Sequence, residues 1–373
     1  MQVILRVLLY LGFALSPVYL FKRGLPQIAD FILLALVGFL LLDRIQYKSS
    51  GNRESLPIIW LGLCVWICFV NLVLSLYYQS YKFLFVSPYY IYNTAIGAAL
   101  YYYLQRYPGS LIDVYRAICC GLIISGVGVI FGFGSGTRAT GFFNNPNQLG
   151  YFSLLGLGSL VVFSQMNIRS GTLGLVATLS GIIGILAAAS LAALAGALMI
   201  AFAYAGSILK FKSLLRSLIG VLLIGVVYVA SQETSLVKTI EGTLTVRAER
   251  FENKVESVYE ERAYERITHF PQFIIFGAGE AYRERFYPYD VNEIHSSFGT
   301  LLFSYGLMGI SLFLGLLVVI SYRAGLVCAI VLSGIAAYSF THMGLRTTSF
   351  WILLVLMLYS AKMKKSQLNY NAL

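Results

Sequence analysis

Residues 57–77 read PIIWLGLCVWICFVNLVLSLY and include no charged side chain. A helix that crosses the hydrocarbon core of a bilayer needs about 20 mostly apolar residues, so this stretch predicts a membrane-spanning helix. The pattern recurs along the chain and predicts about twelve such helices, at residues 3–20, 27–43, 57–77, 88–105, 111–133, 147–166, 171–188, 190–209, 214–231, 296–320, 325–340 and 348–361. We therefore expect an all-α polytopic membrane protein in which residues 1–373 form a single membrane domain.

The composition indicates that most of the chain is surrounded by lipid. Of the 373 residues 58% are hydrophobic and 12% are charged, whereas a soluble domain carries about twice that charged fraction. The formal net charge is +11, but 12 of the 16 acidic residues lie between Glu233 and Glu293. Basic residues scattered between apolar spans are typical of topology signals. Since no nucleic-acid-binding motif is present, we expect no nucleic acid as a partner.

The Lys and Arg residues of the connections predict the orientation. Connections on the side of the N-terminus carry more of them than the short connections on the other side, and the C-terminal tail adds Lys362, Lys364 and Lys365. By the positive-inside rule both termini are then cytoplasmic. The connection at 232–295, between the ninth and tenth spans, forms one large extracytoplasmic loop that holds most of the acidic side chains.

This loop contains a helical pattern with basic residues. Apolar residues recur every four positions between 251 and 263, which predicts a helix that ends near Pro271. Arg262, Arg266 and His269 would lie on roughly one face of it. Two guanidinium groups on one face suit a phosphate or pyrophosphate. The alternative is a solvated surface helix whose arginines pair with neighbouring glutamates.

Two further features follow in the same loop. Gly277 and Gly279 allow a tight turn or the close approach of a ligand, and without a preceding strand they do not indicate a dinucleotide site. His295 lies where the tenth span begins, and a neutral imidazole there can act as a general base near neutral pH. The alternative for His295 is a helix-capping or interfacial histidine.

A second outer connection reads TRATGFFNNPNQLG at residues 137–150. Arg138 stands beside the start of the sixth span, which Asn147 is placed to cap. An arginine between two membrane segments and beside a helix N-terminus suits an anion, although a polar loop with an interfacial arginine is the alternative. No residues have zinc or magnesium ligand spacing and no Walker loop occurs, so we expect neither a metal nor a cofactor.

Five motifs follow one another along the chain: Arg138-x-x-Gly141-x-x-x-Asn145-Pro146-Asn147, Arg262, Gly277-x-Gly279, His295-Ser296 and Gly306-x-x-Gly309. Their order resembles that of the motifs in the O-antigen ligase and polymerase superfamily. Arg266 and Gly277 have the Arg-x10-Gly spacing described for polymerase loops. The resemblance covers roughly residues 135–320. Two features depart from the family. Ser296 stands where many relatives have Asn, and Ala189-Ser190-Leu191 stands where a Ser-Arg pair is common.

The resemblance implies a metal-independent glycosyltransferase with a GT-C type fold in the bacterial inner membrane, whose active site faces the periplasm. Its donor would be an oligosaccharide on undecaprenyl pyrophosphate. Arg138, Arg262 and Arg266 would hold the pyrophosphate, and His295 would take the proton from the attacking sugar hydroxyl. The supporting residues would be Asn147, His269, Gly277 and Gly279.

The Arg-x10-Gly spacing favours an O-antigen or polysaccharide polymerase that joins lipid-linked repeat units. One alternative is an O-antigen ligase, which transfers the glycan to a lipid A core or to a protein. Another is a polysaccharide flippase or exporter without catalysis. Besides the lipid bilayer and the lipid-linked oligosaccharide, a chain-length regulator and a flippase are candidate partners.

Overall fold

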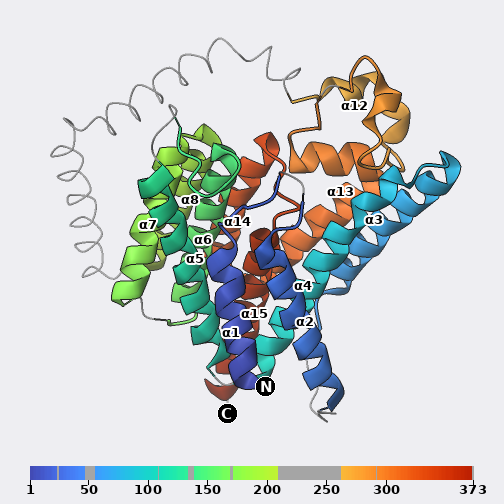
Figure 1. Cartoon of the computed structure of the whole chain (residues 1–373). Coiled ribbons are helices and arrows are strands. Elements are labelled where there is room, and N and C mark those ends of the chain that lie inside the picture. The colour runs from blue at the N-terminus through green and yellow to red at the C-terminus, as the bar shows by residue number, and fades with distance from the viewer. Residues whose placement is uncertain are drawn as a thin grey trace, which may run out of the picture.

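A computed structural model of the chain describes residues 1–22, 25–46, 55–107, 109–132, 138–168, 171–208, 262–290 and 292–371. Within these ranges every regular element is a helix (Figure 1). The long helices are α1 (Gln2–Leu15), α2 (Ile28–Gln46), α3 (Ile58–Tyr77), α4 (Ser87–Arg106), α5 (Ser110–Gly132), α6 (Pro146–Gln165), α7 (Thr172–Ala188), α8 (Leu191–Ile208), α13 (Ser297–Ala324), α14 (Leu326–Thr341) and α15 (Thr348–Asn371). The short helices are η1 (Tyr81–Phe85), α12 (Glu265–His269), η2 (Pro271–Phe273) and η3 (Arg283–Phe286).

Eleven of the twelve predicted spans coincide with a long helix, and the ninth, at 214–231, lies outside the described residues. Most boundaries agree within a few residues. The first span was expected to reach residue 20, but α1 ends at Leu15. Pro17 explains the early end, because it has no N–H to donate and its ring clashes with the preceding turn. In contrast, α15 continues well beyond the predicted end at 361.

The core of the bundle is built around α15, which lies at its centre (Figure 1). Every residue from Phe350 to Leu358 is buried. A helix that is apolar on all sides belongs in the interior, and α15 packs there against α4, α6 and α13. Around it, α1 contacts α2 and α5, α7 contacts α5 and α6, and α8 contacts α14.

In the part of the chain that the structure describes, three helices are long and apolar enough to cross a membrane, namely α3, α5 and α13. On α3, Trp60 and Ile67 face the core, whereas the large apolar side chains of Ile58, Val65 and Leu76 are exposed. Apolar side chains that point outward along a whole helix indicate a lipid environment. The chain is therefore a membrane-embedded helical protein, and the number of twelve spans and the GT-C type remain predictions.

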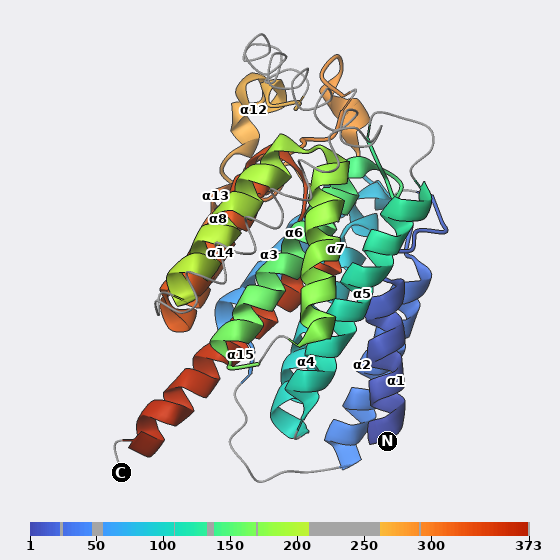
Figure 2. The ribbon, with the colours of Figure 1, turned by 90° about the vertical axis from the view of Figure 1, so that its left-hand side faces the viewer.

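The two termini lie at one end of the bundle, and α12 lies at the other (Figures 1 and 2). The segment 262–295 and the connection between α14 and α15 meet at the end that carries α12. Five of the predicted site residues belong to the segment 262–290, namely Arg262, Arg266, His269, Gly277 and Gly279. The candidate site therefore lies at the end of the bundle remote from the termini.

Candidate functional site

Arg138 fastens the connection between α5 and α6 to the ends of two helices. Its Nε donates to the carbonyl of Ala188 at the end of α7, and its Nη2 donates to Oδ1 of Asn147, both at 2.8 Å. The side chain that caps α6 is Asn145, because Pro146 occupies the first helical position. The prediction that Asn147 caps this helix is therefore wrong. Asn147 lies within the first turn and is the partner of Arg138.

Tyr338 on α14 connects Arg138 with the segment that follows α14. Its hydroxyl donates to the carbonyl of Asn147 at 2.9 Å. Its ring stacks on His342, with the ring centroids 4.5 Å apart. Asn147 is also the partner of Arg138, and the carbonyl of Thr341, three residues after Tyr338, accepts a hydrogen bond from Arg262. Two of the predicted pyrophosphate-binding arginines therefore lie near one aromatic side chain.

Arg262 reaches this region from the segment before α12. A turn at Ala263, where φ is 56°, separates Arg262 from the helix. The expectation that Arg262, Arg266 and His269 share one helix face is therefore wrong for Arg262. The predicted helix between 246 and 261 lies outside the described residues. The Arg262 guanidinium donates instead to the carbonyl of Thr341 at the end of α14.

His295 immediately precedes the cap of α13, as expected for the residue that opens the tenth span. Its backbone N–H donates to the carbonyl of Arg262 at 3.2 Å. The side chain of Ser296 caps α13 by accepting the N–H of Gly299 at 3.1 Å. Since serine and asparagine are both strong N-cap residues, Ser296 can fill the same structural role as the Asn of many relatives.

The start of α13 is fastened to the connection between α14 and α15. The Oγ of Ser297 donates to the His342 carbonyl at 3.2 Å and accepts the Gly344 N–H at 2.9 Å. Together with the contacts above, this brings four segments that are distant in the sequence into one region. We call it the Tyr338 region, and it contains Arg138, Asn147, Arg262, His295, Tyr338 and His342.

Arg266 and His269 make their contacts elsewhere. The Arg266 guanidinium donates to the carbonyl of Tyr289 at 2.7 Å and lies over the ring of Phe286 at 5.5 Å from its centroid. Only 4% of Arg266 is exposed, and this burial lowers the pKa of its guanidinium to about 10. His269 is exposed and stacks on Tyr289 at 4.1 Å. Within the described part of the chain, the hydrogen bonds of the Arg266 side chain and the ring contact of His269 involve other partners than the Arg262 side chain does.

A break in α13 explains why glycines occur at positions 277 and 279. Gly306 has φ 67° and ψ −170°, a backbone conformation that essentially only glycine adopts. A Cβ at this position would also come within 2.2 Å of the Ile275 carbonyl oxygen. The N–H of Leu307 donates out of the helix to the carbonyl of Ile274 at 2.8 Å. The two parts of α13 consequently run in different directions (Figure 1).

Gly277 and Gly279 allow the chain to pack against this break. The N–H groups of Ala278 and Gly279 donate at 2.8 Å to the carbonyls of Phe303 and Ser304, which lie just before the break. A Cβ on Gly277 would come within 2.3 Å of the Ser304 carbonyl oxygen. The glycines thus allow a close approach, but of the backbone of α13; the approach of a ligand to them stays a prediction.

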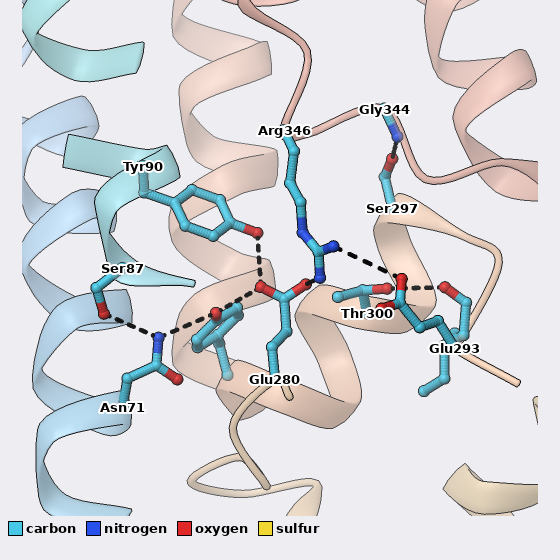
Figure 3. A network of polar contacts seen from close by, with 11 residues as sticks. Asn71, Ser87, Tyr90, Glu280, Glu293, Ser297, Thr300, Gly344 and Arg346 are labelled. Atoms are coloured by element: carbon cyan, nitrogen blue, oxygen red, sulfur yellow. Dashed lines mark hydrogen bonds and ion pairs between the residues drawn. The ribbon is translucent and has the colours of Figure 1, made fainter. Parts of the chain in front are cut away.

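The same turn places Glu280 in a buried polar network (Figure 3). The Oε2 of Glu280 accepts hydrogen bonds from the hydroxyls of Tyr305 at 2.8 Å and Tyr90 at 3.2 Å. Its Oε1 accepts Nη2 of Arg346 at 3.0 Å, and Nη1 of Arg346 lies 3.6 Å from Oε2 of Glu293. Although burial opposes the charge, these two carboxylates raise the pKa of Arg346. A carboxylate with this set of partners is stable in the interior.

Sequence patterns gave Glu280 and Arg346 no role. In the sequence, Arg346 is a basic residue on the short connection between two apolar spans, and Glu280 directly follows a Gly-x-Gly turn. They lie 66 positions apart, so no spacing rule relates them. For Arg346 the sequence did offer one signal, because it is a charged residue between two closely spaced apolar spans, where an unpaired charge is costly.

A pocket opens beside this network, between the segment 279–294, the first part of α13 and the connection that follows α14. It holds about 410 Å³ of space without atoms, part of which is open to solvent. Phe286 and Phe303 form part of its apolar wall. Its charged lining residues are Arg266, Glu280, Arg283, Glu293 and Arg346.

Comparison with known proteins finds no family model and no curated protein that matches this chain. Fold and site alone therefore define its class. It is an all-helical membrane protein with a polar site, rich in arginine, at the end of the bundle remote from the termini. Within the described residues no group of three His, Cys, Asp or Glu side chains is arranged to hold a metal ion.

Proposed function

We propose that the protein is a glycosyltransferase that joins oligosaccharide repeat units carried on undecaprenyl pyrophosphate, at the periplasmic face of the bacterial inner membrane. The observation that carries the proposal is the Tyr338 region. There Arg138 comes from one connection and Arg262 and His295 from another, Arg138 and Arg262 are both linked to the end of α14, and the backbone of His295 is bonded to that of Arg262. Arginines that bind an anion, next to a histidine at the start of a helix, are what this chemistry needs.

The reaction moves a glycan from the pyrophosphate to a sugar hydroxyl. The hydroxyl oxygen of the acceptor forms a bond to the anomeric carbon of the donor, and the bond from that carbon to the pyrophosphate oxygen breaks. Negative charge then develops on undecaprenyl pyrophosphate, where Arg138 and Arg262 would stabilise it through charge-assisted hydrogen bonds. His295 would accept the proton of the attacking hydroxyl. Arg266 and His269 have no part in this proposal, because their contacts lie outside the Tyr338 region.

The test is an assay of purified full-length protein in nanodiscs with lipid-linked repeat units. General base catalysis contributes about 10²–10⁴-fold, so His295→Ala should slow product formation by that factor. His269→Ala is the matched comparison and should retain near wild-type activity. If His295→Ala elongates the glycan at the wild-type rate, the general-base assignment is wrong and transport without catalysis becomes the better explanation.

The arginines are tested by replacement with lysine, which keeps the charge but loses the forked pair of donors. Arg138→Lys and Arg262→Lys should each reduce the rate by about tenfold or more, since a hydrogen bond to a charged group contributes about 1.5–3 kcal/mol. Arg323→Lys, at the other end of α13, is the control. Silent lysine variants at both positions would refute the role of the forked donors.

The products separate a polymerase from a ligase. A polymerase lengthens the glycan on undecaprenyl pyrophosphate, so a ladder of repeat units should form from the lipid-linked donor alone. A ligase instead needs a lipid A core or a protein acceptor and forms no ladder. A product that appears only when such an acceptor is added would overturn the polymerase assignment while leaving the transfer chemistry in place.

A further inference from the structure

The pocket beside α13 contains a buried cation without a carboxylate partner in the described part of the chain. Arg266 is 4% exposed, and its guanidinium donates to the backbone carbonyls of Tyr289 and Asn292. No carboxylate of the described residues forms an ion pair with it. Buried charges in proteins are normally paired or bound to a ligand of opposite charge. Asp290 and Glu293 favour its charge from a distance, but neither forms an ion pair with it, so among the described residues the positive charge of Arg266 is only partly balanced at the wall of an open pocket.

A second arginine adds to this charge. Arg283 on η3 lines the same pocket, is half-buried and has no ion pair among the described residues. After burial itself, the charge of Arg283 is the largest influence that lowers the pKa of Arg266. Two guanidinium groups that repel each other across a pocket favour the binding of an anion between them.

The remaining charges of the pocket do not cancel this excess. Arg346 is balanced by Glu280, whose carboxylate accepts three hydrogen bonds. Glu293 lies at the rim with 49% of its side chain exposed, and it approaches Arg346 only to 3.6 Å. Three arginines against two glutamates leave the lining of the pocket with one net positive charge.

We propose that this pocket is a second anion site, separate from the pyrophosphate site, that binds an acidic group of the acceptor glycan, either a carboxylate or a phosphate. Ile294 forms part of its wall and is followed in the chain by His295. An acceptor held here would therefore lie next to the proposed general base. The assignment to the acceptor rests on the proposed function, whereas the binding of an anion does not.

The experiment measures binding to the full-length protein in nanodiscs by saturation-transfer NMR and calorimetry. The probes are methyl glucuronide for a carboxylate, glucose 6-phosphate for a phosphate, and methyl glucoside as the neutral control. We expect at least one acidic probe to bind at least tenfold more tightly than methyl glucoside. The preferred acidic probe identifies the group, and equal binding of all three sugars would overturn the proposal.

Variants locate the site with effects of opposite sign. Arg283→Gln should weaken binding of the acidic probe by about tenfold or more, because it removes a charged donor. Glu293→Gln should strengthen binding, because it removes a competing carboxylate. Arg323→Gln at the far end of α13 should have no effect. Weaker binding in Glu293→Gln, or unchanged binding in Arg283→Gln, would contradict the proposal.

Arg262→Gln distinguishes this site from the pyrophosphate site. It should leave the affinity for methyl glucuronide, the probe without a phosphate, unchanged, because Arg262 contacts Thr341 and does not line the pocket. Loss of binding in Arg262→Gln but not in Arg283→Gln would mean that only the Tyr338 region binds anions. These measurements need no turnover, so they can fail while the activity test of His295 succeeds, and the reverse also holds.

Discussion

Removal of Arg346 should destabilise the protein strongly, because Glu280 would remain as a buried carboxylate. The side chain of Glu280 is 4% exposed and that of Arg346 is 29% exposed. Loss of one partner of a buried ion pair costs about 3–5 kcal/mol. Arg346 is partly solvated, and the hydroxyls of Tyr90 and Tyr305 would still donate to the carboxylate. We therefore expect Arg346→Met to cost about 3 kcal/mol, the lower end of that range.

Two further variants show whether the buried charge is the cause. The double variant Glu280→Gln with Arg346→Met should be more stable than Arg346→Met alone, because it leaves no unpaired charge in the interior. Lys82→Met is the surface control. It breaks a shorter ion pair, from Lys82 to Glu284 at 2.7 Å, but both side chains are largely exposed. That change should cost under about 1 kcal/mol.

The assay is equilibrium unfolding in detergent micelles, followed by tryptophan fluorescence and circular dichroism on all variants under one condition. The free energy of unfolding should decrease in the order wild type, Lys82→Met, double variant, Arg346→Met. If Arg346→Met and Lys82→Met are equally stable, the carboxylate of Glu280 is not buried as described. If the double variant is the least stable, the ion pair between Glu280 and Arg346 itself stabilises the protein. The loss in Arg346→Met would then not come from an unpaired buried charge.

The break and the cap of α13 give two further predictions. Gly306→Ala should destabilise the protein by about 1–3 kcal/mol, since φ is 67° and the added Cβ meets a carbonyl oxygen; a stability equal to wild type in the same unfolding assay would refute the break. Ser296→Ala should cost about 1 kcal/mol, whereas Ser296→Asn should be nearly neutral because asparagine also caps helices. Equal losses for both Ser296 variants would show that the hydroxyl acts through packing instead.

Hydropathy predicted most of the helices because the length of an apolar segment is a local property. Eleven predicted spans coincide with helices, and His295-Ser296 marks the start of α13 as expected. Arg138 contacts the first turn of α6, as expected of a residue on the connection before that helix. Its position follows from the order of helices and connections, which the sequence displays directly.

Interactions between distant segments were not predictable in this way. The pairing of Glu280 with Arg346 depends on how α13 bends and where its neighbours pack. The separation of Arg262 from Arg266 depends on a positive φ at Ala263, a residue type that seldom adopts it. Both features are decided by tertiary contacts, which override the local helical pattern.

The break at Gly306 also bears on how deep in the bilayer the first part of α13 lies. The part of α13 from Leu307 to Ala324 is about 27 Å long at 1.5 Å per residue, which nearly equals the hydrocarbon thickness of about 30 Å. The second part of α13 can therefore cross the acyl chains by itself. The first part, with the turn at Gly277 to Glu280 packed on it, is then left at the level of the lipid headgroups. The proposed glycosyl-transfer site would then be open both to molecules dissolved in water and to lipid headgroups that diffuse in the plane of the bilayer.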